Sequence, residues 1–144
     1  MPDTYASHLP VLQMMLGLVK PKRVLELGSG PHSTPLFLQA GVKLTSLETD
    51  EGWFMKAEGY GDFDLRLVED VVESLPLIGD FDLVFIDNSD NETDREKAIR
   101  AVLSQAHPVT VIHDAEYPLY RAAIEEAKNY MIFSDLVPHT AVCW

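Results

Sequence analysis

Short apolar runs alternate along this chain with segments in which apolar residues recur at helical spacing. Five of the runs have the length of buried strands and stop at or near a glycine or an acid: residues 22–27, 43–48, 65–69, 81–86 and 109–113. Runs of this kind are typical of parallel strands covered on both faces. Because strands that alternate with helices form parallel sheets, the order predicts an α/β fold.

Helical spacing is clearest in four segments, residues 5–19, 33–39, 93–107 and 119–129. Ser33 or Thr34 is the predicted cap of the second helix and Thr93 that of the third, since hydroxyl side chains accept hydrogen bonds from the free amides at a helix start. Pro21 and Pro108 close the first and third helices, because proline disfavours helical backbone in the residue before it.

Two further strand-like runs, residues 131–134 and 140–144, finish the chain and suit an antiparallel pair at the sheet edge. The full order predicts a three-layer Rossmann-like fold, with a mostly parallel sheet of about seven strands and an antiparallel C-terminal edge strand. A chain of 144 residues with 47% hydrophobic residues has the size of one domain. We therefore expect residues 1–144 to form a single domain.

Acidic residues outnumber basic ones by 23 to 11, which gives a formal charge of −12 at pH 7. This charge repels phosphate backbones and anionic lipids, so we expect neither nucleic acid nor a membrane surface as a partner. No apolar run approaches the roughly 18 residues that span a bilayer. The single cysteine, Cys143, cannot form an intrachain disulfide. The expectation is a cytoplasmic protein.

The first strand leads into a helix through Gly28 and Gly30 at alternate positions. This pattern is typical of nucleotide-binding loops, where glycine permits a sharp turn and lets a ligand approach the backbone. On two glycines alone, an ordinary strand-to-helix turn explains the pattern equally well. If a ligand needs the space, replacing Gly28 with valine should abolish binding and leave the core intact.

Glu48 ends the second strand twenty residues after Gly28. A carboxylate at that position accepts hydrogen bonds from the two hydroxyls of a ribose, so adenosine binding is preferred to a solvated acid at a strand end. A dinucleotide is disfavoured because Ser33 occupies the third glycine position of its fingerprint. Glu26 would repel a pyrophosphate and favour the cationic amino and sulfonium groups of S-adenosylmethionine.

At these motifs the chain resembles the class I S-adenosylmethionine-dependent methyltransferases, and the resemblance runs through nearly the whole sequence in order. Residues 26–30 are similar to that family's first motif, residues 46–53 to its second, and residues 69–71 to the segment where an acid meets the adenine amino group. Asp70 is the candidate for that contact, and a helix cap is the equal alternative. The resemblance implies these cofactor-binding residues: Glu26, Gly28, Ser29, Gly30, Glu48, Thr49, Asp70, Val71 and Asp87.

Polar residues follow the fourth and fifth predicted strands. Parallel strands deliver their carboxyl ends to one rim, so Asp87, Asn88, His113 and Asp114 should converge near the reactive end of the nucleotide. Asp87, His113 and Asp114 are the catalytic candidates, with His113 as general base because its pKa is ordinarily near neutrality. The same three could ligate Mg²⁺, as a similarity to metal-assisted O-methyltransferases implies, but a histidine suits that ion poorly and a metal-free rim is preferred.

The leading hypothesis is therefore methyl transfer to an unidentified acceptor, small or macromolecular, with a hydroxyl as one option. The alternative is a non-catalytic module that binds S-adenosylmethionine or a related nucleoside, and an oxidoreductase is a distant third. Because little sequence is left to build an acceptor pocket, a second copy of the chain could close the site as a homodimer. Tyr5, His8, Tyr117 and Tyr120 could line an acceptor pocket, but a packing or surface role is preferred for each. Residues 90–96 are interpreted as an exposed charged segment.

Overall fold

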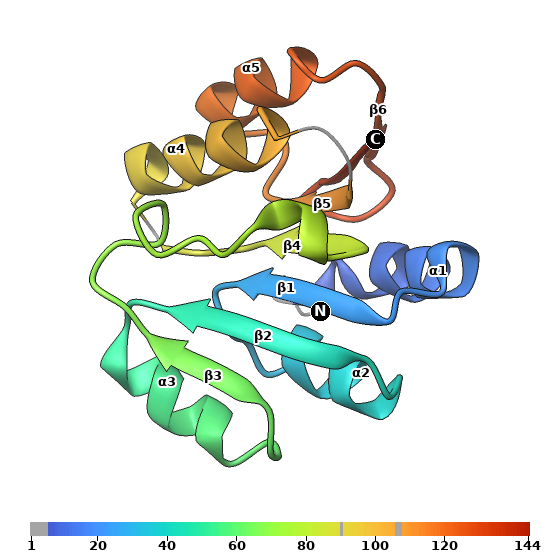
Figure 1. The fold of residues 1–144 in the computed structure, drawn as a ribbon. Helices are drawn as coiled ribbons and strands as arrows, with labels where there is room; N and C mark the ends of the chain where they lie inside the picture. Colours follow the sequence, from blue (N-terminus) through green and yellow to red (C-terminus); the bar gives the residue numbers. More distant parts are fainter. Residues whose placement is uncertain (1–5, 90, 106–107) are drawn as a thin grey trace.

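The computed structural model describes residues 6–89, 91–105 and 108–144, in which seven strands form one sheet with helices on both sides (Figure 1). The strands are β1 (Arg23–Leu27), β2 (Lys43–Glu48), β3 (Asp64–Leu67), β4 (Leu83–Ile86), β5 (Val109–His113), β6 (Tyr130–Phe133) and β7 (Thr140–Cys143). The α-helices are α1 (Leu9–Val19), α2 (Ser33–Gln39), α3 (Glu51–Glu58), α4 (Glu92–Leu103) and α5 (Pro118–Glu125). A 3-10 turn, η2 (Ile78–Asp80), precedes β4.

The strand order is β3-β2-β1-β4-β5-β7-β6, and the first five of these strands are parallel. Strand β7 lies antiparallel between β5 and β6. The direction of winding reverses at β1, because the chain leaves the β3 edge and returns beside β1 as β4. In open α/β sheets the carboxyl ends of the strands at such a reversal flank the ligand crevice.

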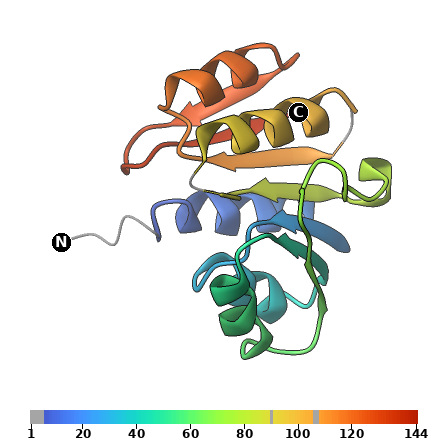
Figure 2. The ribbon, with the colours of Figure 1, turned by 90° about the vertical axis from the view of Figure 1, so that its left-hand side faces the viewer.

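Alternating residues of the central strands fill two separate cores. In β4, Leu83 and Phe85 pack with α1 and α2 on one face. Val84 and Ile86 pack with α4 and α5, which lie side by side on the other face (Figure 2). A parallel sheet covered on both faces requires this continuous apolar sequence.

The predicted α/β class, three layers and antiparallel C-terminal pair are confirmed. The boundaries of β2 and β5 agree with the prediction to the residue. The last helix was predicted too long: it ends at Glu125, and Tyr130 already begins β6. Tyr5, the predicted start of the first helix, lies outside the described residues. None of the helices described is both long and apolar enough to cross a membrane.

The predicted helix caps were wrong in two places. Asn91, and not Thr93, caps α4: its side-chain oxygen accepts hydrogen bonds from the backbone amides of Thr93 and Asp94. Helix α2 has no side-chain cap. Its two hydroxyl residues, Ser33 and Thr34, donate to a buried carboxylate instead.

Gly28 allows two strands to meet closely. It has a φ of +85°, and a β-carbon built on it would lie 2.5 Å from the carbonyl oxygen of Asp87 and 2.7 Å from the Cα of Asn88. Both atoms are backbone at the end of β4, so neither can move aside cheaply. At Gly30 the nearest atom to such a carbon is the Ser33 hydroxyl at 3.6 Å. The two glycines of the motif therefore have different roles, and Gly28 is required by the fold itself.

This difference changes the expectation for Gly28 variants. We predict that Gly28→Ala lowers the free energy of unfolding by more than about 3 kcal/mol, because left-handed strain adds to a backbone clash. Gly30→Ala should cost less than about 1 kcal/mol, since the space is open. Urea denaturation of both variants measures the contrast. Equal losses in the two variants would contradict the assignment.

Candidate functional site

A cavity of about 460 Å³ opens at the carboxyl ends of the parallel strands. This volume is within the usual range for small-molecule sites. Four strand ends contribute to its lining: Ser29 and Gly30 after β1, Glu48 and Thr49 at β2, Asp87 after β4, and His113 and Asp114 at β5. The sheet topology thus brings together most of the residues predicted from separate motifs.

Glu48 joins the two loops on one side of the cavity. Its Oε1 accepts hydrogen bonds from the amide and hydroxyl of Ser29, both at 3.0 Å. Its Oε2 accepts from the amides of Thr49 and Asp50 at 2.9 and 3.1 Å. Burial raises the pKa of Glu48, although these hydrogen bonds oppose the shift. The Ser29 hydroxyl can rotate, so a ligand hydroxyl can take its place on Oε1.

Glu26 lies beneath the glycine loop and does not line the cavity. Its side chain is fully buried and accepts hydrogen bonds from the hydroxyls of Ser33, Thr34 and Ser46 at 2.7, 2.8 and 2.5 Å. Burial raises its pKa to about 7, against the effect of these hydroxyls. The structure therefore gives Glu26 a role in holding α2 and β2 to the loop, and does not bring it to the surface where a ligand cation would bind.

A second cavity of about 90 Å³ adjoins the first, and Thr49 and Ser89 line both. Asp70, Val71 and Asn88 line only the smaller one. The Oδ1 atom of the buried Asn88 has no hydrogen-bond partner among the described residues. An unsatisfied buried acceptor is costly, so the smaller cavity suits a ligand with an amino donor.

Asp70 lines this second cavity and also acts as a cap, which was the alternative to binding adenine. Its Oδ1 accepts a hydrogen bond from the amide of Glu73 at 3.0 Å, which caps the turn after β3. Its neighbour Val71 is buried and belongs to the core on the α4 and α5 side. Of the two predicted residues, Asp70 is thus an exposed acid, and Val71 forms part of the apolar wall of the cavity.

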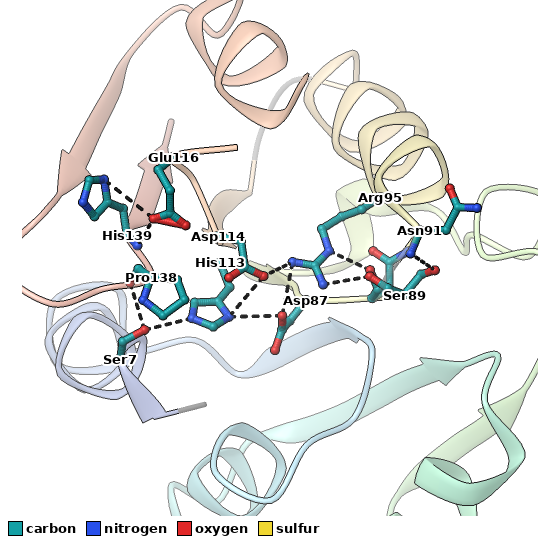
Figure 3. Close-up of polar contacts among 11 residues, drawn as sticks. Ser7, Asp87, Ser89, Asn91, Arg95, His113, Asp114, Glu116, Pro138 and His139 are labelled. Carbon is teal, nitrogen blue, oxygen red and sulfur yellow. Dashed lines mark hydrogen bonds and ion pairs between the residues drawn. The ribbon is translucent and has the colours of Figure 1, made fainter. Parts of the chain in front are cut away.

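The side chains of Asp87, His113 and Asp114 converge (Figure 3). All three line the larger cavity. Asp87 Oδ1 lies 3.2 Å from His113 Nδ1, and Asp114 Oδ2 lies 3.7 Å from the same nitrogen. Asn88, which follows Asp87, turns away into the smaller cavity. The convergence expected from parallel strands is thus present for three of the four rim residues.

Arg95 is the residue at this rim that the sequence interpretation missed. It belongs to the segment predicted to be exposed, of which Asp90 lies outside the described residues, yet Arg95 is only 5% exposed. Its Nη1 contacts Asp114 Oδ2 at 2.5 Å and Asp87 Oδ1 at 3.4 Å. The signal was helical spacing: Arg95 stands four residues before Ile99 and seven before Val102, on the buried face of α4.

His113 is held on both sides of its ring. Ser7 Oγ lies 2.9 Å from Nε2 and donates its single proton to the carbonyl of Pro138 at 2.9 Å, so Nε2 is the donor toward Ser7. Nδ1 faces the carboxylate of Asp87. Burial lowers the pKa of His113, but the bond to Asp87 and the charges of Asp87 and Asp114 outweigh it and raise the pKa above 6.5. The contacts therefore describe an imidazolium.

The segment before α1 closes this side of the cavity. His8, interpreted as packing or surface, is buried, lines the cavity and meets the His113 ring edge to face at 4.7 Å between centroids. Tyr117 also lines the cavity. Tyr120 packs in the core, with the Arg95 guanidinium 5.3 Å from its ring centre. Only contacts across about a hundred residues of sequence bring Ser7 and His8 here.

The residues around the two cavities fit adenosine better than they fit a divalent ion. Glu48 and Asn88 offer acceptors to hydroxyl and amino donors. At the rim, Asp87 and Asp114 already share the guanidinium of Arg95. A metal ion between these two acids would meet the guanidinium, so the rim does not fit Mg²⁺.

Comparison with known proteins shows the fold alone. No protein-family model and no curated protein matches the chain. Among solved structures, the bifunctional kinase-methyltransferase WbdD matches with a TM-score of 0.64 and 15% identity, over 99% of this chain and 40% of WbdD. This chain thus spans less than half the length of WbdD.

Two other matches were solved with methyl-transfer ligands. The Burkholderia thailandensis 1,6-didemethyltoxoflavin-N1-methyltransferase, with bound 1,6-didemethyltoxoflavin and S-adenosylhomocysteine, has a TM-score of 0.60 and 18% identity, over 96% of this chain and 77% of that one. The T. thermophilus 16S rRNA N2 G1207 methyltransferase RsmC, in complex with AdoMet and guanosine, has a TM-score of 0.62 and 16% identity, over 85% and 34%. The chain has the class I methyltransferase fold.

The raised pKa of Glu26 predicts how stability depends on pH. A carboxyl group whose pKa is about 7 when folded and 4.5 otherwise stabilises the fold fully below pH 4.5 and loses that contribution as the pH rises through 7. The loss is on the order of 3 kcal/mol. In Glu26→Gln this dependence should vanish, so the stability of wild type relative to the variant falls between pH 4.5 and 8.

Chemical denaturation across this pH range measures the difference, with the exposed Glu58→Gln as the matched control. A difference between wild type and Glu26→Gln that stays constant with pH would show that Glu26 is ionised throughout.

Proposed function

We propose that this chain is an S-adenosylmethionine-dependent methyltransferase whose acceptor presents a hydroxyl group. One observation carries the proposal: Glu48 lines the larger of two adjoining cavities, at the strand end from which a carboxylate binds ribose, and the next residue, Thr49, lines both. The smaller cavity suits an adenine ring and the larger a methionine chain with the acceptor.

The cofactor would be held by side chains from the end of β2 and from the loops after β2, β3 and β4. Glu48 would accept hydrogen bonds from the ribose, and Asn88 and Asp70 stand where an adenine amino group could donate. Thr49, which lines both cavities, would lie at their junction. When bound, S-adenosylmethionine supplies an electrophilic methyl group on a positively charged sulfur. When His113 has lost its proton, the rim carries one net negative charge, which would favour that positive charge electrostatically.

The rim residues would position the acceptor and receive its proton. In a neutral His113, the proton would stay on Nδ1 and be donated in a hydrogen bond to Asp87, and Nε2 could act as a base. In the structure Nε2 already contacts a hydroxyl, that of Ser7, at 2.9 Å. An acceptor hydroxyl could replace the Ser7 hydroxyl with no net loss of hydrogen bonds, which is why we favour oxygen as the methylated atom. Alignment of acceptor and donor would then supply most of the rate.

A second candidate is a binding module without catalysis. It is favoured by the contacts at the rim. Arg95 forms ion pairs with both acids, and both ring nitrogens of His113 form hydrogen bonds. Such a module needs Glu48 and the two cavities but no free base. The two candidates share the cofactor site and differ only at the rim.

The cofactor site is tested by Glu48→Gln. Loss of one carboxylate oxygen and of the negative charge should weaken binding of S-adenosylhomocysteine at least tenfold, because each ribose hydroxyl loses a charged acceptor. Calorimetric titration measures the affinity. The exposed Glu51→Gln, three residues further along the chain in α3, is the control and should bind as wild type does. Unchanged affinity in folded Glu48→Gln would remove the carboxylate from the proposal.

The base is tested by the titration of His113. We expect its imidazolium to persist above pH 6.5, and Asp87→Asn to lower its pKa, because the amide removes a hydrogen-bonded negative charge. The NMR shifts of the ring C–H groups follow the titration without any need for an acceptor. Asp94→Asn, an exposed acid of α4, should leave it unchanged. A pKa that is insensitive to Asp87→Asn would argue against the pair.

A further inference from the structure

The guanidinium of Arg95 lies between the two acids of the rim (Figure 3). Asp87 follows β4 and Asp114 follows β5, so the parallel pairing of these strands sets the carboxylates side by side. Nη1 of Arg95 reaches both, at 3.4 Å from Asp87 Oδ1 and 2.5 Å from Asp114 Oδ2. The arginine comes from α4, on a different element from either acid.

The other two nitrogens of the Arg95 guanidinium also donate hydrogen bonds to oxygen atoms. Nε donates to the carbonyl of Asn88 at 2.7 Å, and Nη2 donates to the carbonyl of Ser89 at 2.8 Å. The guanidinium therefore sits among four oxygens, two from carboxylates and two from backbone carbonyls. Such a set of oxygens is what Mg²⁺, Mn²⁺ or Ca²⁺ prefers.

The backbone around Arg95 is held in a strained conformation. Asp114 and Ser89 have φ values of 60° and 58°, in the left-handed region that side chains other than glycine rarely adopt. Each makes a direct contact with the guanidinium. Strain of about 1 kcal/mol or more at each residue persists only where surrounding contacts enforce it. Arg95 is thus in contact with both residues whose backbone is held in this way.

We propose that Arg95 is the permanent cation of this rim and occupies the position of a divalent metal ion, so that the site works without bound metal. A guanidinium keeps its charge at every physiological pH and needs no supply of ions. It fixes the two carboxylates as a metal would, but leaves no coordination position for an acceptor oxygen. That this arrangement affects catalysis rests on the proposed methyl transfer. That Arg95 takes the place of a metal ion does not depend on the proposed function.

A different group of residues nearby could hold a metal ion and is the main alternative. His8, Asp87 and His113 each offer one ligand atom, and these atoms lie within 4.8 Å of one another. Asp87 Oδ1 is already shared by His113 Nδ1 and Arg95 Nη1. An ion bound there would lie close to a buried guanidinium, which repels it.

Metal titration of the whole chain tests the proposal. Mn²⁺ binding is followed by electron paramagnetic resonance, and Zn²⁺ binding by calorimetry, in wild type, Arg95→Gln and Arg95→Lys. We expect no specific site in wild type and none in Arg95→Lys, which keeps the charge. In Arg95→Gln the freed oxygens should bind Mn²⁺ at least tenfold more tightly than wild type does. Adding Asp114→Asn to Arg95→Gln should abolish the gain.

Arg100→Gln is the matched control, because it removes one charge from the same helix at a more exposed position. It should gain no metal affinity. Tight stoichiometric binding of Mn²⁺ or Zn²⁺ by wild type would overturn the proposal, and loss of that binding in His8→Ala would assign it to the histidine set. A folded Arg95→Gln that gains no affinity would also overturn it. If Arg95→Gln does not fold, the wild-type titration still decides.

These results are independent of the methyl-transfer proposal. Failure of the chain to bind S-adenosylhomocysteine would remove the proposed function and leave the metal titrations as they stand. Conversely, tight metal binding by wild type together with S-adenosylhomocysteine binding would keep the function and remove the role of Arg95.

Discussion

The contact between the backbone of Gly28 and the backbone at the end of β4 is the constraint on which the site depends. No β-carbon fits between Gly28 and the carbonyl of Asp87. Asn88 and Ser89, which follow Asp87 directly, line the second cavity. With a larger residue the strand ends would separate, and both cavities would lose a wall. The motif suggested that Gly28 makes room for a ligand, but in the structure Gly28 makes room for the backbone after β4.

The fold was predictable because its signal is periodic and local. Apolar runs such as 43–48 and 109–113 specify buried parallel strands, and parallel pairing alone requires Asp87, His113 and Asp114 to meet at one rim. The direction of a buried side chain is not local. Glu26 was expected to face a ligand, but its sequence position is equally consistent with the buried site it occupies beneath α2. A carboxylate acquires its role from the hydroxyls that fold against it.

Arg95 and Ser7 show the other limit of sequence reasoning. Arg95 stands in a run of charges, and such runs are usually solvated; its spacing with Ile99 and Val102 was the one local sign of burial. Ser7 reaches His113 across 106 residues of sequence, through the packing of α1 on the sheet. Interactions that two distant elements create together leave no trace in either segment alone.

The electrostatics of the rim differ from those of the whole chain. The protein carries a formal charge of −12, whereas Asp87 and Asp114 are balanced at the rim by Arg95 and a protonated His113. The rim is thus nearly neutral inside an acidic molecule. Loss of the His113 proton would leave one net negative charge beside the cavity, which is the state that favours a sulfonium and provides a base.

We propose that the two cavities form one crevice for an adenosine nucleoside. The most direct measurement is a ¹⁵N amide titration of the wild-type chain with S-adenosylhomocysteine, with NAD as the comparison ligand. We expect saturable shifts for S-adenosylhomocysteine at Gly30, Thr49, Val71 and Asn88, which span both cavities, and none of comparable size for NAD. Shifts confined to other surfaces, or no shifts at all, would contradict it.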